Sequence, residues 1–520
     1  MKIAFINDSC ERLGVEYISA VLKQHGHTVK LFADPQLFND ENFTIAPLAR
    51  FFDQQDELLA QVQAFQPDLV GFSVVTDFYQ WACALARRIK TVMDVPVLFG
   101  GIHATSVPEK VLKQDCVDMV CRGEGELALL DLANSMEQGR MNYAIPNIWF
   151  KKNGRIIKND VRPLIEDLDA LPFPDKDLFY EASPHFSKCY FLMTNRGCAY
   201  ACSYCCNSFL KKFYHSKGRY LRFRSAANVI AELELAKQKY GIKMVRIHDD
   251  DFLTHDVPWF EEFAEKYSTR IQAPFACFTH PNSVTEIKAR LLKKAGCHDI
   301  EVGVQSISAE TRSGVLNRNV SDEQLIRSLK ILKDAGIKVV TDNILGLPHQ
   351  GQEELLDLIK FYNKNRIMKI YCFGFRHYPA TDIVEYSRNA GLLTDEDVDN
   401  LENGVNVKTF IQSGDILSRE AKQLQTFFAF LLYLPEQINN YILEKKLYRF
   451  FIPLPYYILV IFSNWLRIPY RYNWALHITV CRYRVYTFKK IKNKLQLAFR
   501  RGHRGPHPIT LKSVPENPSH

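Results

Sequence analysis

The chain has 520 residues, of which 47% are hydrophobic and 24% are charged. This composition excludes a disordered chain and predicts a folded protein of two or three domains. The net charge of +8 lies in the tail, because residues 436–520 hold 15 Lys or Arg against 3 Asp or Glu, which leaves −4 for the rest. Thirteen cysteines and the absence of a signal-peptide pattern after Met1 favour a cytosolic protein with reduced thiols.

Short apolar runs alternate with helical patterns through residues 1–140. Strands are predicted at 2–7, 28–32, 68–75, 95–101 and 117–121. Such alternation indicates a parallel, doubly wound sheet, whose ligands bind beyond the carboxyl ends of the strands. At these ends Ser73 and Thr76 offer hydroxyl groups, and Gly100 with Gly101 permits close approach of a ligand to the backbone. Each signal is weak alone, because a Gly-Gly pair is usually only a tight turn.

A proline-rich linker is predicted at 141–185, followed by a second series of strands and helices. The strands of this series are predicted at 189–194, 244–249, 274–279, 299–305, 338–345 and 369–375. Six such units favour a partial (β/α)6 barrel of the TIM type over residues 186–395, with reactive groups at the carboxyl ends of its strands.

Three cysteines follow the first strand of this series with the spacing C-x3-C-x2-C. Cys198, Cys202 and Cys205 supply three thiolates where a 4Fe-4S cluster needs four, so one iron is left open for chemistry. A structural zinc site is the alternative, but it requires four ligands in two separated pairs, and no second pair lies nearby. Cys206 is not expected to be a fourth ligand, because the thiols of adjacent residues point apart.

This loop resembles the cluster loop of the radical S-adenosylmethionine (SAM) enzymes, and later strand ends are similar to SAM-contacting segments of that family. The resemblance implies that the methionine part of SAM chelates the open iron and that Tyr204 packs on the adenine. The other implied SAM contacts are Asp249, Asp250, Gln305, Ser306, Gly346 and Pro348. Plain alternatives are a rim aromatic for Tyr204, a helix cap for the aspartates and a rim amide for Gln305.

The N-terminal region, placed before such a loop, resembles the cobalamin-binding domain of one branch of the family. The implied cobalamin contacts are Ser73, Thr76, Gly100, Gly101 and His103. The Asp-x-His-x-x-Gly motif that provides a histidine ligand to cobalt is absent, since residues 8–14 read Asp-Ser-Cys-Glu-Arg-Leu-Gly. We therefore expect cobalamin to bind without a histidine ligand on its lower face. Because the motif is missing, a domain that has lost its corrinoid is the alternative.

Residues 396–520 match no assignable pattern and are expected to be mainly helical, aromatic and basic. The apolar run 450–466 would span about 26 Å as a helix, which is short for a ~30 Å hydrocarbon core. Two interpretations remain: an interfacial helix on an anionic membrane, or a helical cap that buries its aromatic side chains on the barrel mouth. No nucleic-acid partner is expected, because no recognised module accompanies the basic charge.

The leading hypothesis is a cobalamin-dependent radical SAM enzyme that methylates an unactivated carbon of a small or lipid-like substrate. A radical cyclase or other carbon–carbon bond-forming enzyme without methyl transfer is one alternative. A non-catalytic corrinoid-binding or regulatory protein with a structural cluster is another. The resemblance also implies an electron donor such as flavodoxin or ferredoxin, and the expected location is cytoplasmic or peripheral on the cytoplasmic face of the membrane. Residues that act directly in catalysis are not assigned by the sequence.

Overall fold

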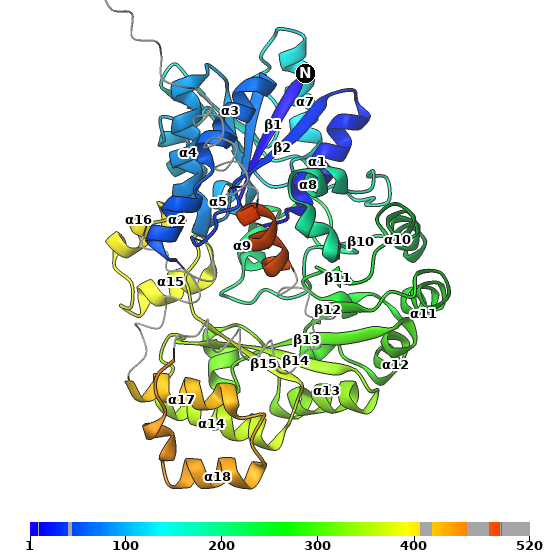
Figure 1. The fold of residues 1–520 in the computed structure, drawn as a ribbon, viewed down its shortest axis with the longest axis vertical. Helices are drawn as coiled ribbons and strands as arrows, with labels where there is room; N and C mark the ends of the chain where they lie inside the picture. The colour runs from blue at the N-terminus through cyan, green and yellow to red at the C-terminus, as the bar shows by residue number, and fades with distance from the viewer. Residues whose placement is uncertain (9, 40–43, 406–418, 455–477, 489, 491–520) are drawn as a thin grey trace, which may run out of the picture.

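The computed structural model describes residues 1–8, 10–39, 44–405, 419–454, 478–488 and 490. A parallel sheet near the N-terminus and a partial barrel below it make up most of the molecule (Figure 1). The helix of residues 478–488 (red in Figure 1) packs near the start of the barrel, where the Tyr486 hydroxyl lies 2.9 Å from the Ser183 hydroxyl.

The first sheet has the strand order β2-β1-β3-β4-β5-β6-β7. Its parallel strands are β1 (Lys2–Asn7), β2 (Thr28–Ala33), β3 (Leu69–Ser73), β4 (Val97–Gly100) and β5 (Met119–Cys121), which confirms the five expected strands. An antiparallel hairpin, β6 (Ile148–Lys152) and β7 (Arg155–Ile157), extends the sheet into the predicted linker, where no strand was expected. The order 2-1-3-4-5 reverses between β1 and β3, the switch point where such sheets bind ligands.

Helices cover both faces of this sheet, as expected for a doubly wound fold. One face packs against α1 (Leu13–Gln24), α7 (Glu126–Glu137) and α8 (Lys176–Ala182). The opposite face packs against α3 (Gln55–Phe65), α4 (Tyr79–Val92), α5 (Gly101–Ser106) and α6 (Pro108–Lys113), while the short α2 (Ala46–Phe52) buries no residue. The two apolar cores lie on the two faces of the sheet, so the carboxyl ends of the strands stay open for a ligand.

The second sheet is the partial barrel, with six parallel strands in chain order. They are β8 (Tyr190–Leu192), β11 (Val245–Ile247), β12 (Phe275–Thr279), β13 (Cys297–Gln305), β14 (Lys338–Leu345) and β15 (Lys369–Gly374), which confirms the predicted (β/α)6 arrangement. The outer helices are α10 (Ala226–Tyr240), α11 (Val257–Lys266), α12 (Glu286–Ala295), α13 (Asp322–Asp334) and α14 (Gln352–Lys364). Ser225, Thr285 and Ser321 cap three of these helices with their hydroxyl groups, which fixes where each begins.

The segment between β8 and α10 departs from the regular barrel. A small antiparallel pair, β9 (Asn195–Arg196) and β10 (Arg222–Phe223), brackets the cysteine loop and α9 (Cys206–Phe213). These elements lie between the N-terminal sheet and the barrel (Figure 1). The cysteine loop is therefore held at the boundary between the two units.

After the barrel, α15 (Asp382–Asn389) and α16 (Asp395–Glu402) return to the N-terminal unit, and α17 (Arg419–Phe430) and α18 (Glu436–Glu444) pack on the outside of the barrel. Phe427 and Leu431 are buried in the barrel core, and the Arg366 guanidinium donates to backbone carbonyls of residues 431–434. This part of the tail therefore covers outer helix α14. Most of the predicted apolar run, residues 455–466, lies outside the described residues. No helix in the described part of the chain is long and apolar enough to cross a membrane.

Candidate active site

A cavity of about 330 Å³ lies at the carboxyl ends of the barrel strands. Cys198, Cys202 and Cys205 all line it, whereas Cys206 lines a neighbouring cavity instead. Three cysteines thus line one shared space, and this donor set fits a 4Fe-4S cluster with one open iron. The expectation that the adjacent thiols point apart is wrong, because the Cys206 side chain hydrogen-bonds Cys205 and lowers the Cys205 pKa to about 7. Burial raises the pKa of Cys198 to about 12, so cluster assembly must displace a proton from this thiol.

The cysteine loop is held by the turn that follows β13. The Ser203 backbone N–H donates to the Leu316 carbonyl at 2.9 Å, and the Ser203 hydroxyl donates to the Val315 carbonyl at 2.6 Å. Arg318 Nη1 lies 3.4 Å from Cys202 Sγ, and the same guanidinium bonds the Gly303 carbonyl. Gly303 leaves room for this contact, because a Cβ there would lie 3.1 Å from Arg318 Nη2. The sequence analysis did not single out Arg318, and no local motif marks it.

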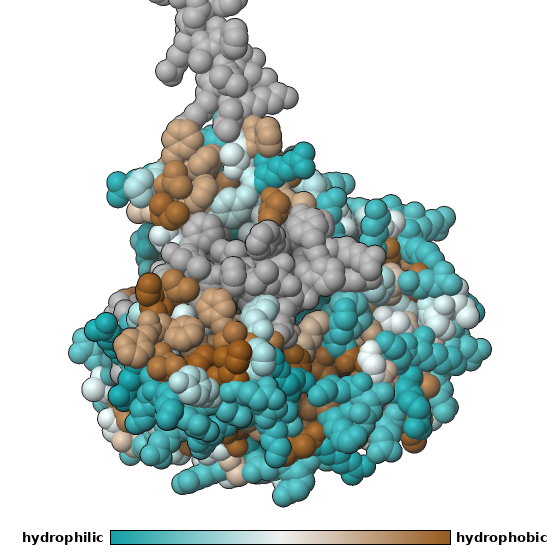
Figure 2. Space-filling model, turned by 60° about the horizontal axis from the view of Figure 1, so that its bottom comes forward, coloured by the Kyte–Doolittle hydropathy of each residue, from teal (hydrophilic) through white to brown (hydrophobic). Residues whose placement is uncertain are grey.

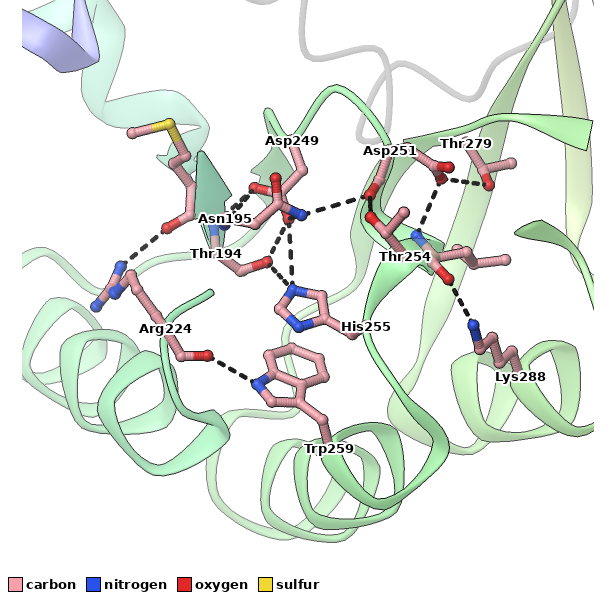
Figure 3. Close-up of polar contacts among 12 residues, drawn as sticks. Thr194, Asn195, Arg224, Asp249, Asp251, Thr254, His255, Trp259, Thr279 and Lys288 are labelled. Carbon is pink, nitrogen blue, oxygen red and sulfur yellow. Dashed lines mark hydrogen bonds and ion pairs between the residues drawn. The ribbon is translucent and has the colours of Figure 1, made fainter. Parts of the chain in front are cut away.

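The three consecutive aspartates after β11 have different environments, and Figure 3 shows those of Asp249 and Asp251. Asp249 is fully buried and accepts hydrogen bonds from the backbone N–H groups of Thr194 and Asn195 and from both of their side chains. Burial raises its pKa to about 7, in spite of these bonds. Asp249 thereby fixes the chain just ahead of the first cluster cysteine, with His255 beside it at 2.7 Å from the Thr194 hydroxyl.

Asp251 also holds the backbone in place through hydrogen bonds, near the end of β12, whereas Asp250 does not. Asp251 accepts from the Thr279 hydroxyl at 3.0 Å and from the Ser283 hydroxyl at 2.5 Å, which ties it to the end of β12. Asp250 lines the cavity, and among the described residues only Asn207 donates to its carboxylate, at 3.1 Å. Asp250 is therefore the aspartate that is available to a ligand.

The remaining predicted SAM contacts divide into two groups. Tyr204 and Gln305 line the cavity together with Asp249 and Asp250, and Gln305 has a left-handed backbone with φ +67°. A non-glycine residue in this conformation is strained, and such strain is common at functional sites. Ser306 does not line the cavity, and its hydroxyl donates to Glu354. Gly346 and Pro348 lie in the turn after β14, where the Gly346 N–H donates to Gln350 at 2.6 Å.

A second cavity, of about 440 Å³, lies between the N-terminal sheet and the cysteine segment. Ser73, Gly100 and Gly101 line it at the switch-point edge of the sheet, together with apolar residues of α1 and α7. Gly101 has φ +89°, and a Cβ there would lie 2.7 Å from backbone atoms of Val74, so only glycine fits at this wall. Such a bare, largely apolar wall fits the edge of a corrin ring.

Thr76 and His103 are placed away from this cavity. They are buried together, with Thr76 Oγ1 3.0 Å from His103 Nδ1, and the His103 ring packs on Tyr79. Burial lowers the pKa of His103 to about 4, so its ring is neutral. Leu13 and Gly14 from the atypical first loop line the cavity, and the one histidine in its described lining is His248, on the barrel side. The absence of a histidine ligand on the lower face therefore stays a prediction.

The two cavities adjoin. Asn207, His248 and Asp250 line both of them. His248 is neutral, because burial lowers its pKa to about 3, and its ring lies 4.3 Å from that of Phe191. Asn207 and His248 were not predicted as site residues, because nothing in their local pattern shows that two domains meet there. A molecule held at this shared wall would be accessible from both cavities.

Buried ion pairs fasten the two units beside the second cavity. Arg196 pairs with Glu124 at 3.1 Å and with Glu126 at 2.6 Å, and Arg222 pairs with Glu124 at 2.8 Å. Burial alone would raise the pKa of Glu124, but these two guanidinium groups hold it below its usual value. Glu124 and Glu126, just after β5, therefore join the N-terminal sheet to the cysteine segment.

The fold and these cavities define a two-domain enzyme with one cofactor site in each domain. Residues 192–362 match the Radical SAM superfamily model, and residues 4–133 match the B12 binding domain model. An uncharacterised methyltransferase of Pyrococcus horikoshii is 28% identical over 388 residues, 73% of this chain and 79% of the relative. An anaerobic magnesium-protoporphyrin IX monomethyl ester cyclase of Rubrivivax gelatinosus is 25% identical over 435 residues, 81% of this chain and 74% of the relative.

The solved structure of the cobalamin-dependent radical SAM enzyme OxsB, with aqua-cobalamin and SAM bound, has the same fold. It aligns with a TM-score of 0.65 and 14% identity, and the alignment covers 98% of this chain and 82% of OxsB. The chain belongs to the radical SAM enzymes that carry a cobalamin-binding domain. Its cofactors are a 4Fe-4S cluster, SAM and cobalamin.

Proposed function

We propose that this enzyme transfers a methyl group to an unactivated carbon of a small-molecule substrate. The observation that carries the proposal is the shared wall of Asn207, His248 and Asp250, which puts the SAM cavity and the cobalamin cavity side by side. When bound, the cofactors supply a 5'-deoxyadenosyl radical that removes a hydrogen atom and a methyl group that replaces it. The protein holds the cofactors and the substrate in position and keeps water away from them.

The polar groups of the SAM cavity suit the two ends of an amino acid. Asp250 offers a carboxylate to an ammonium group, and Arg318 offers a buried guanidinium to a carboxylate. Tyr204 packs against Leu347 and Phe375 in an apolar cluster that offers one wall to the adenine. Asp249 holds the start of the cysteine loop, and the segments of Ser306, Gly346 and Pro348 support the cavity from behind its lining.

Methyl transfer is tested with SAM that carries a deuterated methyl group. The protein is loaded with cluster and cobalamin, reduced with dithionite, and incubated with extract metabolites. We expect 5'-deoxyadenosine and S-adenosylhomocysteine to form together, and one metabolite to gain the deuterated methyl group. Release of neither nucleoside under these conditions would contradict the proposal.

Radical cyclisation without methyl transfer is the second candidate function. The similarity to a cyclase over 81% of this chain favours keeping it. The same labelling experiment separates the two reactions: a cyclase would release 5'-deoxyadenosine in the presence of its substrate, and no product would carry the label.

We propose that an acidic one-electron donor such as flavodoxin or ferredoxin docks beside α9. Lys212 is exposed there and pairs with Asp382 at 2.7 Å, and Lys211 Nζ donates to the carbonyl of Ala199 in the cysteine loop at 2.7 Å, so basic side chains at this surface lie next to the cluster site. Reduction of the cluster by flavodoxin should slow in Lys212→Glu and with rising salt, whereas reduction by dithionite should not. Equal flavodoxin rates in Lys212→Glu and wild type would contradict this docking site.

We also propose that the tip of the C-terminal helices touches an anionic membrane. Phe450 is 83% exposed and Ile452 is 76% exposed, with Lys445 and Lys446 beside them. Hydrophobic surface gathers on the end of the molecule that Figure 2 turns forward. Aromatic and aliphatic side chains flanked by lysines suit a lipid interface, and a lipid-like substrate would then be close to the barrel.

Point substitutions test this contact without removing the packed part of the tail. The wild type should sediment with anionic liposomes and be released by high salt, because salt screens the attraction to each lysine. Phe450→Ser with Ile452→Ser should sediment less. Leu235→Ser is the matched control, since Leu235 is 49% exposed on the distant α10. Equal sedimentation of the double variant and the wild type would contradict the proposal.

A further inference from the structure

His280 is a buried histidine at the end of β12 that lines the SAM cavity. Its side chain is 4% exposed, and its ring stacks on Tyr200 with 3.6 Å between ring centroids and 15° between planes. The backbone N–H of His280 donates to Asp251 at 3.3 Å. The ring is therefore held in one orientation by its stacking partner and by the backbone that carries it.

The hydrogen bond at one ring nitrogen determines where the proton lies. His280 Nδ1 accepts from the backbone N–H of Asn282 at 3.2 Å, so in the neutral ring the proton is on Nε2. Burial lowers the pKa of His280 to about 2, which keeps the ring neutral at physiological pH. Nε2 is buried and has no hydrogen-bond partner among the described residues. A buried donor without a partner is unfavourable and calls for a ligand.

The cavity lining combines hydrogen-bond donors with carboxylates. Arg318 and His280 both line the cavity, and the Arg318 Nε also has no partner in the described part of the chain. Asp250, Glu301 and Asp342 are carboxylates of the same lining, and Asp250 has one described donor, Asn207. This polarity is complementary to the carboxylate and ammonium of an amino acid, which is the methionine end of SAM.

We propose that the Nε2–H of His280 donates to the methionine carboxylate of SAM and positions it beside Arg318. This inference rests on the placement of SAM in this cavity and goes beyond it by assigning a positioning role to a neutral histidine. No sequence motif indicated His280, since the role depends on the Asn282 N–H, which fixes the tautomer, and on Tyr200, which fixes the plane of the ring.

Two substitutions separate the roles of the two ring nitrogens. His280→Asn keeps an acceptor near Nδ1 for the Asn282 N–H but loses the donor at Nε2, whereas His280→Gln places an amide donor near Nε2. Binding of S-adenosylhomocysteine to the cluster-loaded protein is measured by calorimetry, because this ligand keeps the carboxylate and undergoes no turnover. We expect His280→Asn to bind on the order of tenfold more weakly and His280→Gln to bind within about threefold of the wild type.

A ligand without the carboxylate tests the partner of the donor. Decarboxylated SAM should bind His280→Asn and the wild type equally, because it lacks the group that His280 contacts. An equal loss of affinity for both ligands would overturn the proposal, and so would wild-type affinity of His280→Asn for S-adenosylhomocysteine. Iron content is measured in every variant.

A second pair of variants tests the proposal if His280→Asn does not load the cluster. His280→Gln and His280→Glu both lose the Nδ1 acceptor but differ in having a donor or a carboxylate near Nε2. We expect the glutamate variant to bind S-adenosylhomocysteine at least tenfold more weakly than the glutamine variant. Equal binding would overturn the proposal. These binding measurements do not depend on methyl transfer, so failure of the proposed reaction would leave their outcome unchanged.

Discussion

Asp249→Asn is the substitution for which the structure makes the sharpest prediction. Four donors from Thr194 and Asn195 converge on the two carboxylate oxygens, at 2.6 Å for the Thr194 N–H and at 3.1–3.2 Å for those of Asn195. Above pH 7 the Asp249 carboxyl is ionised and both of its oxygens accept, whereas an amide has one acceptor oxygen, so at least one donor on the other side loses its partner and faces an NH2 group. At about 1–3 kcal/mol for each unsatisfied buried donor, one or two such donors destabilise the native state by about 1–6 kcal/mol.

This cost is a large fraction of the ~5–15 kcal/mol that stabilises a typical domain. We expect Asp249→Asn to lower the melting temperature and the iron content of the reconstituted protein, because Thr194 and Asn195 lead directly into the cysteine loop. Asp250→Asn is the matched control: Asp250 has one described partner, Asn207, so stability should change little. That variant should instead bind S-adenosylhomocysteine about tenfold or more weakly. Wild-type melting and iron content in Asp249→Asn would refute this reasoning.

Three other predictions follow from the site. Changing any of the three cysteines that line the SAM cavity to Ala should abolish the iron–sulfur absorbance and SAM cleavage, while Cys206→Ala should keep both. Gly101→Val should block cobalamin binding. His103→Ala should leave the spectrum of bound cobalamin unchanged, and nitrogen hyperfine structure from a protein histidine on cobalt would contradict this expectation. The pKa of Asp249 is about 7 in the folded protein and near 4 in the unfolded chain, so the native state binds more protons between these pH values. The free energy of unfolding should therefore fall as pH rises from about 4 to 7, by up to about 4 kcal/mol. Thermal melts across this range should show a slope that Asp249→Asn lacks.

Much of the fold was predictable because strands are local patterns. The eleven parallel strands follow from apolar runs separated by helical periodicity, and the cluster ligands follow from a spacing within eight residues, Cys198 to Cys205. The antiparallel hairpin β6–β7 was missed, because prolines around it indicated a linker. Of the glycine pair at the end of β4, Gly101 requires glycine, because its backbone lies against that of Val74, whereas Gly100 has room for a Cβ.

Side-chain direction was not predictable, because it depends on contacts with residues distant in the chain. Three adjacent aspartates look alike in the sequence, yet only tertiary packing directs Asp249 to Thr194, Asp251 to Ser283 and Asp250 into the cavity. The same packing turns His103 away from the cobalamin cavity.

The sequence by itself determined the positions of the parallel strands along the chain, the cluster-binding cysteines and the family, because each is encoded in neighbouring residues. Only the tertiary structure decided which groups meet across the site. Arg318 comes within 3.4 Å of Cys202, 116 residues earlier, because the β13 turn packs on the cysteine loop. His280 becomes a donor because its other nitrogen is already bonded. Hydrogen bonding and burial act through space, and local sequence patterns do not specify which distant residues become neighbours.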